Sequence, residues 1–115
     1  MHEISIMQST LQLAEKYARE AGGTAISRIC LRVGAVSGVV PEALEFAFDV
    51  LKKETLAKSA SLHIERVPVE FTCSRCRSSL RLNEIRFDCP DCGELLTLGG
   101  GGAELELSHL ELIQS

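Results

Sequence analysis

Aromatic side chains are scarce in this sequence. It has no tryptophan, one tyrosine and four phenylalanines, although 45% of its 115 residues are hydrophobic. Aliphatic side chains must therefore build the core, and the length suits one domain or a small domain with a satellite module. No apolar run approaches the roughly 20 residues of a membrane span, and the start lacks the basic and apolar regions of an export signal. These absences predict a soluble protein of the cytoplasm, not bound to a membrane.

The sequence also lacks a basic surplus, because 12 lysines and arginines face 16 aspartates and glutamates. Nucleic-acid-binding proteins usually carry excess positive charge, so this balance argues against that class. No nucleophile motif is present, and the glycine run Gly99–Gly102 has no following Lys-Ser or Lys-Thr of a phosphate-binding loop. The sequence therefore does not predict an enzyme.

Two segments have the apolar spacing of helices. From Ile4 to Ala21 apolar residues recur at steps of three and four, and Gly22-Gly23 follows as a C-terminal stop. From Pro41 to Leu56 a second apolar face follows a proline, which the first turn of a helix tolerates. We expect two amphipathic helices over these ranges.

Three segments have the period-two alternation of strands. The first covers residues 29–33, and the second lies within residues 61–71. Pro68 indicates that this second strand reaches the edge of a sheet or changes its pairing there. The third, at residues 105–113, alternates again. Because two strands alone make a marginal sheet, the closing segment is the natural third member.

These elements predict an α+β fold, in which a small three-stranded sheet is covered by two helices and a further module is inserted. We expect residues 1–69 plus 99–115 to form one α/β domain. Residues 70–98 should form the inserted domain, which the chain leaves through Gly99–Gly102 as a flexible joint.

Four cysteines have the spacing of a zinc site. Cys73 and Cys76 form one C-x2-C pair and Cys89 and Cys92 another, separated by twelve residues. Each pair can direct two thiolates at one ion, and the loop can bring the pairs together into a tetrahedron. Gly93 suits the tight turn after a pair, because glycine accepts a positive φ. Disulfides or iron are the alternatives, but four cysteine ligands and no export signal favour structural zinc. The inserted module is therefore expected to be zinc-ribbon-like, with residues 70–98 as the zinc-binding domain.

Three further residues of metal-binding type have no partner motif. Cys30 lies within a predicted strand, where a small semi-buried residue is the ordinary interpretation. His63 is expected on the solvent side of its strand, and His109 in the last strand has no assigned role.

The first three residues, Met1, His2 and Glu3, can form a different kind of site. The free α-amine, the deprotonated amide of His2 and its imidazole can all reach one ion, and such nitrogen donors favour Ni(II) or Cu(II). Glu3 could add an oxygen or orient a ligand. The alternative is an ordinary solvated histidine near a terminus. The metal interpretation requires that the chain begin at Met1 with its amine free.

The order of these motifs resembles the HypA/HybF family of hydrogenase maturation factors, which are nickel metallochaperones. The resemblance rests on the Met1-His2-Glu3 start, on L-R-V-G-x-x-S-G-V-x-P-E-x-L-x-F-A-F from Leu31 to Phe48, and on the knuckles from Cys73 to Cys92. It covers nearly the whole chain.

The resemblance implies Ni(II) at the N-terminus, with His2 essential and Glu3 contributing, and Zn(II) on the four cysteines. It thus implies that residues 1–69 plus 99–115 are the nickel-binding α/β domain. It also implies a HypB-type GTPase and the large subunit of [NiFe]-hydrogenase as partners, with urease as a further target in some organisms. The resemblance is equally compatible with a monomer and with a homodimer. The rival from another class is a zinc-ribbon adaptor that binds protein or nucleic acid.

Overall fold

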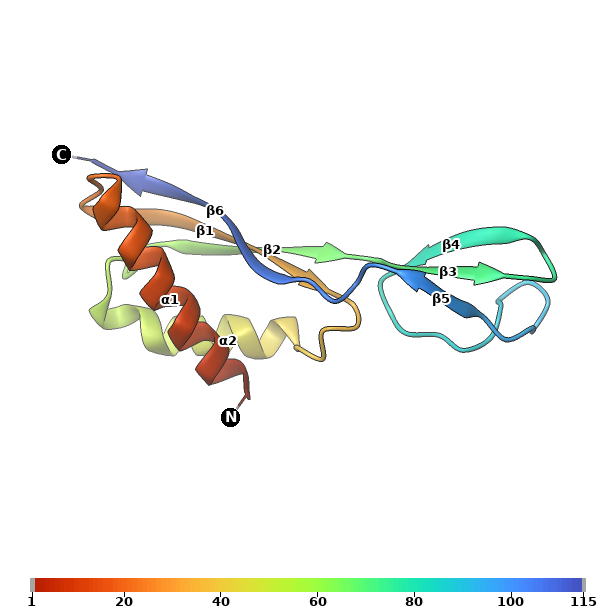
Figure 1. The fold of residues 1–115 in the computed structure, drawn as a ribbon. Coiled ribbons are helices and arrows are strands. Elements are labelled where there is room, and N and C mark those ends of the chain that lie inside the picture. The colour runs from red at the N-terminus through yellow and green to blue at the C-terminus, as the bar shows by residue number, and fades with distance from the viewer. Residues whose placement is uncertain (1, 115) are drawn as a thin grey trace. The chain divides into compact units, whose positions relative to one another are not determined.

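The computed structural model describes residues 2–114, and Met1 of the predicted nickel site lies outside the described residues. The elements in chain order (Figure 1) are α1 (His2–Glu20), β1 (Ala25–Gly34), α2 (Pro41–Leu51), the 3-10 turn η1 (Lys52–Glu54), β2 (Ser61–Val67), β3 (Val69–Cys73), β4 (Ser78–Leu82), β5 (Thr97–Gly100) and β6 (Leu105–Ile113). Within residues 2–114, none of the helices has the length and apolar character needed to cross a membrane.

Together with α1 and α2, unit 1 is built on a three-stranded sheet with the strand order β2-β1-β6. β1 and β2 run in the same direction with α2 between them in the chain, while β6 runs the opposite way (Figure 1). Parallel neighbours need such a crossover, which explains why α2 separates them. The predicted α+β fold, with two helices and a closing strand at Leu105–Ile113, is confirmed.

The core around this sheet is almost entirely aliphatic, as the composition predicts. Each helix buries one face, and the second half of β1 buries residues on both of its faces. The buried side chains include Met7, Leu11, Ala14 and Ala18 from α1, Leu44, Ala47 and Phe48 from α2, and Ile26, Ile29, Cys30, Leu31 and Val33 from β1. Phe48 is the one aromatic residue among them.

Both helices differ from their predicted ranges. α1 begins at His2, two residues before Ile4, and ends at Glu20. The expectation that α2 continues to Leu56 is wrong, because it ends at Leu51 and tightens into η1. Thr55 explains the end: its N–H and its hydroxyl both donate to the Lys52 carbonyl, at 3.0 and 2.8 Å.

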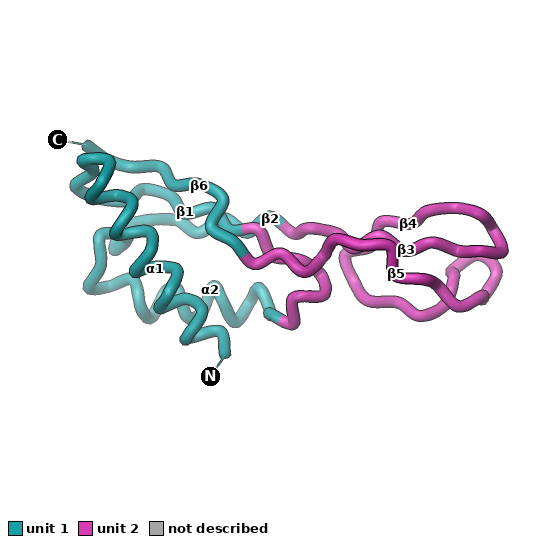
Figure 2. The backbone as a smooth tube through the Cα atoms, viewed as in Figure 1, with its two compact units in different colours: residues 1–31, 39–65, 106–115 teal, residues 32–38, 66–105 magenta. Residues whose placement is uncertain are grey.

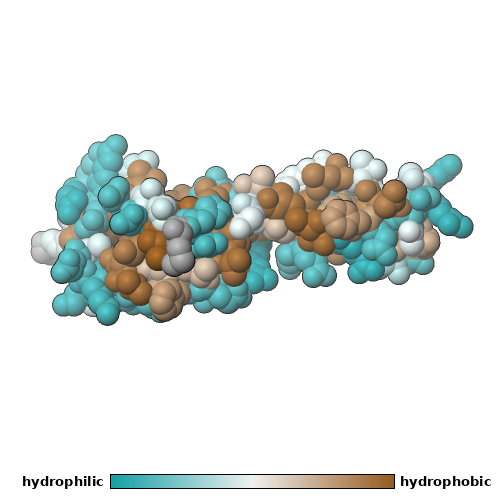
Figure 3. All heavy atoms as spheres, turned by 90° about the horizontal axis from the view of Figure 1, so that it is seen from below, coloured by the Kyte–Doolittle hydropathy of each residue, from teal (hydrophilic) through white to brown (hydrophobic). Residues whose placement is uncertain are grey.

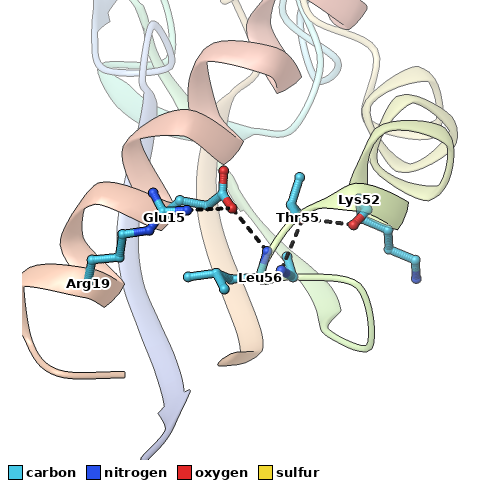
Figure 4. A network of polar contacts seen from close by, with 6 residues as sticks. Glu15, Arg19, Lys52, Thr55 and Leu56 are labelled. Atoms are coloured by element: carbon cyan, nitrogen blue, oxygen red, sulfur yellow. Dashed lines mark hydrogen bonds and ion pairs between the residues drawn. The ribbon is translucent and has the colours of Figure 1, made fainter. Parts of the chain in front are cut away.

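A carboxylate on α1 holds the segment that follows this turn (Figure 4). Oε2 of Glu15 accepts a hydrogen bond from the Leu56 N–H at 3.1 Å and lies 3.5 Å from Nη2 of Arg19. The Ala57 N–H donates to the Thr55 hydroxyl at 3.0 Å. These contacts give partners to backbone groups that a continuing helix would have paired.

The chain divides into two compact units (Figure 2). Unit 1 comprises residues 1–31, 39–65 and 106–115, and unit 2 comprises residues 32–38 and 66–105. Unit 2 contains a second sheet, in the order β4-β3-β5, which the sequence did not suggest. Pro68 separates β2 from β3, as expected for a change of strand. The division into domains of residues 1–69 plus 99–115 and 70–98 stays a prediction.

The glycine run is structured over part of its length, and its role as a flexible joint stays a prediction. Gly99 and Gly100 belong to β5, and Gly100 pairs with Glu70 of β3. Gly102 is buried with a φ of +83°, and a Cβ there would lie 2.8 Å from Cβ of Val69. Glycine is therefore required at Gly102 for a left-handed backbone and for close packing.

Candidate metal sites

The first cysteine pair lies where β3 ends and turns toward β4. Cys73 is the last residue of β3, and the Cys76 N–H donates to its Sγ at 3.3 Å. Arg77 follows with a φ of +53°, which turns the chain into β4 at Ser78. A knuckle of this kind directs both thiols of the pair to the same side.

The second pair also leads into a turn with a positive φ. The Gly93 N–H donates to the Cys89 carbonyl at 2.9 Å, and the Cys89 N–H donates to the Glu94 carbonyl at 2.7 Å. Gly93 has a φ of +78°, the conformation predicted for it. Arg77 and Gly93 each come directly after the second cysteine of their pair. The sequence reveals this turn at Gly93 but not at Arg77, because arginine rarely adopts it.

The two knuckles bring all four thiols together. The Sγ atoms of the four cysteines all lie within 4.8 Å of one another. Sγ of Cys73 is 3.5 Å from Sγ of Cys92, and Sγ of Cys76 is 4.0 Å from Sγ of Cys89. All four are free thiols. A tetrahedron with zinc–sulfur bonds of about 2.3 Å has edges of about 3.8 Å, so the donor set and spacing fit zinc.

Two of the thiols have shifted pKa values in opposite directions. The Cys76 N–H stabilises the Cys73 thiolate and lowers the pKa of that thiol to about 7. Hydrogen bonds with the Cys92 and Cys73 thiols raise the pKa of Cys76 to about 12. The cluster alone therefore favours a thiolate at Cys73 and opposes the loss of the proton from Cys76. A divalent cation supplies the charge that four thiolates need.

His2 and Glu3 lie on the first turn of α1, in unit 1. The His2 side chain is 61% exposed, and its Nδ1 lies 3.9 Å from Oε2 of Glu3, whose side chain is half-buried. The N–H groups in a helix's first turn have no acceptor within the helix. The amide of His2 can therefore lose its proton without breaking a helical hydrogen bond.

The remaining residues of metal-binding type do not join either group. Cys30 is buried in β1, where the Ser108 hydroxyl donates to its carbonyl at 3.2 Å. His63 is exposed on β2, as expected, and His109 is exposed on β6 with its Nδ1 3.3 Å from the Ser108 hydroxyl. Within the described part of the chain, the four cysteines form the cluster suited to a metal ion.

One feature of unit 2 is absent from the sequence prediction. Large apolar side chains are exposed near the second knuckle, among them Ile85, Phe87, Leu95 and Leu98. Their spacing has no helical or strand period that would separate a surface patch from a core. The sequence therefore gives no signal that these side chains form an exposed patch.

Comparison with known proteins identifies relatives over the whole chain. The model of the family described as "Hydrogenase/urease nickel incorporation, metallochaperone, hypA" matches residues 1–112. The hydrogenase maturation factor HypA of Picosynechococcus is 42% identical over 113 residues, covering 98% of this chain and 100% of the relative. HypA of Roseiflexus is 41% identical over 112 residues, covering 96% of this chain and 91% of the relative.

A solved structure supports the same relationship. The solution structure of the Ni metallochaperone HypA from Helicobacter pylori matches with a TM-score of 0.67 and 26% sequence identity. The match covers 98% of each chain. On the family match over nearly its whole length and these relatives, the chain belongs to the HypA family of hydrogenase and urease nickel-incorporation metallochaperones.

Proposed function

We propose that this chain carries Ni(II) at its N-terminus and delivers it during maturation of [NiFe]-hydrogenase. The ligands are the α-amine of Met1 and the amide and imidazole nitrogens of His2, with Glu3 as a further donor or orienting group. The observation that carries the proposal is the exposed His2 on the first turn of α1 in a chain of this family.

The position of the site suits a carrier rather than an enzyme. Nickel, as cargo, must be held against loss and then passed on, and an exposed helix end gives a recipient's ligands direct access. The Glu3 carboxylate, 3.9 Å from His2 Nδ1, offsets part of the positive helix end that otherwise opposes a cation. Because the amide must be deprotonated, nickel affinity falls as the pH falls.

We also propose that Cys73, Cys76, Cys89 and Cys92 hold a structural Zn(II), which cross-links the two knuckles of unit 2. The support is the mutual approach of the four thiols in a set without other ligand types. Replacing Cys73 with alanine should release zinc and unfold β3–β5, because metal binding and folding are linked in such modules. Metal analysis and amide exchange measure this, and retained zinc with protected amides would contradict it.

The partners follow from the same proposal. The family description names hydrogenase and urease nickel incorporation, which supports a HypB-type GTPase, the hydrogenase large subunit and, as a second recipient, urease. The site of action is the cytoplasm, where these enzymes would receive nickel. Either a monomer or a homodimer can perform this role, since the proposed nickel ligands come from one chain.

Nickel titration of two protein forms tests the N-terminal site. One form starts at Met1 and the other carries residues added before Met1, which convert the α-amine into an amide. We expect the extension to weaken nickel binding at least about tenfold, while both forms keep one zinc per chain. Equal nickel affinity in the two forms would contradict the terminal site and leave the zinc-ribbon adaptor as the better explanation.

His2→Ala tests the imidazole ligand separately. It should also weaken nickel binding but leave thermal unfolding nearly unchanged, because an exposed terminal side chain contributes little packing. A large loss of stability in this variant would show that the loss of nickel reflects damage to α1 instead.

A further inference from the structure

Unit 2 exposes apolar side chains that its own small core does not use. Phe87 is 76% exposed, Leu98 58% and Ile85 55%, while Val69 and Phe71 form the buried centre. In the space-filling view, apolar residues gather over the part of the chain that forms unit 2 (Figure 3). Apolar patches on small soluble proteins usually mark an interaction surface.

These side chains line a hollow of about 250 Å³. Its walls come from the β3–β5 sheet and from the segment before the second knuckle, and the lining residues are Val36, Phe71, Ile85, Arg86, Phe87, Leu96 and Leu98. Phe71 and Leu98 are register partners in the sheet, and the Leu96 N–H donates to the Phe87 carbonyl at 2.8 Å. The hollow is therefore built on paired backbone, and its size suits one or two side chains rather than a drug-sized ligand.

Among the described residues that line the hollow, Arg86 alone is charged. Its Nε donates to the Asp88 carbonyl at 2.8 Å and lies 3.6 Å from Oδ1 of Asp88. Both contacts use Nε, so the two terminal nitrogens can donate to a ligand. A guanidinium held in this way suits a carboxylate, which it binds through two parallel hydrogen bonds.

We propose that this hollow docks a segment of a partner protein that offers an apolar side chain with a carboxylate beside it. The apolar side chain enters between Phe87 and Leu98, and the carboxylate binds Arg86. A membrane surface is the poorer fit, because residues 70–98 carry four arginines against five carboxylates and thus no excess charge toward anionic lipid. This inference goes beyond nickel carriage, and it holds whether or not nickel binds at the N-terminus.

A pair of small probes tests the two halves of the proposed recognition. The probes are N-acetyl-L-phenylalanine, which carries a carboxylate, and its neutral amide, each titrated into the zinc-loaded full chain. Heteronuclear NMR should show amide shifts confined to Ile85–Phe87 and Leu96–Leu98. We expect the acid to bind roughly fivefold more tightly than the amide, through the charge-assisted hydrogen bonds to Arg86.

Variants then separate the contributions. Arg86→Gln should reduce the affinity for the acid to that for the amide, whereas Arg81→Gln, an exposed arginine outside the lining, should change neither. Leu98→Ser should abolish both interactions, whereas Leu95→Ser, also exposed but outside the lining, should not. Zinc content and nickel affinity should be unchanged in all four variants, which separates failure here from failure of the carrier function.

Several results would overturn the proposal. Equal affinity for acid and amide removes the role of Arg86, and an absence of shifts at the hollow removes the site. Concentration-dependent shifts without probe that Phe87→Ser abolishes would make a second copy of the chain the occupant. Sedimentation with phosphatidylcholine–phosphatidylglycerol vesicles that the same variant abolishes would make a membrane the occupant.

Discussion

Replacing Gly34 with alanine probes the closest backbone approach in unit 2. Gly34 is the last residue of β1, and its N–H donates to the Glu104 carbonyl at 2.7 Å. The Val36 N–H donates to the Gly102 carbonyl at 2.6 Å. A Cβ on Gly34 would overlap the Gly102 carbonyl group and lie 2.7 Å from the Glu104 nitrogen. Because every obstructing atom is backbone, the two segments must separate.

The cost can be estimated from two contributions. Overpacking by a methyl group costs about 1–3 kcal/mol, and each of the two hydrogen bonds contributes about 0.5–1.5 kcal/mol. Together they predict a loss of about 2–6 kcal/mol, a large share of the roughly 5–15 kcal/mol of a typical domain. The melting temperature should fall by about 8 °C or more.

Urea unfolding of the zinc-loaded protein, followed by circular dichroism, measures the change. Gly99→Ala is the matched control, because a Cβ there would be 3.2 Å from the Glu70 carbonyl oxygen, on an edge strand that can yield. It should cost less than about 1 kcal/mol. If Gly34→Ala is no more destabilising than Gly99→Ala, the close approach is not the reason that position 34 is glycine.

Two further substitutions test packing and polar contacts in unit 1. Phe48→Ala should lower the unfolding free energy by about 3–5 kcal/mol, whereas Phe46→Ala should cost less than about 0.5 kcal/mol, because Phe48 is 2% exposed and Phe46 65%. Similar losses in the two variants by urea unfolding would contradict this assignment of faces. Glu15→Ala should cost about 1 kcal/mol, since the Leu56 N–H loses its acceptor, and faster amide exchange at Leu56 should accompany it. Unchanged exchange there would show that the carboxylate contributes nothing.

Local patterns in the sequence predict much of unit 1. The apolar steps from Ile4 to Ala21 reflect a face that α1 buries, and the alternation at Leu105–Ile113 predicts the strand that completes the sheet. The cysteine spacing predicts the cluster, since two short loops can converge in few ways. In each case a residue's role depends mainly on near neighbours in the chain.

What the sequence does not predict depends on individual side-chain hydrogen bonds or on contacts between distant segments. The end of α2 at Leu51 depends on Thr55, whose hydroxyl donates to the Lys52 carbonyl. In a continuing helix that carbonyl would accept a backbone N–H of the next turn instead. The run Gly99–Gly102 has the composition of a linker, and its true constraint appears only when Val69 lies against Gly102. The short strands β4 and β5 have no strong alternation, and their pairing with β3 defines them.

The segment between β2 and β6 begins and ends on paired residues, and this affects how the three-stranded sheet assembles. Glu70 pairs with Gly100, so the excursion from β2 to β6 has its two ends held within one strand spacing. Bringing together the ends of an unstructured excursion of roughly 40 residues would cost about 3 kcal/mol of chain entropy. While unit 2 is folded, β6 joins β1 without that cost. Disruption of the cysteine cluster would therefore lengthen the loop that β6 must close. The three-stranded sheet would become less stable, although no residue of β1, β2 or β6 has changed.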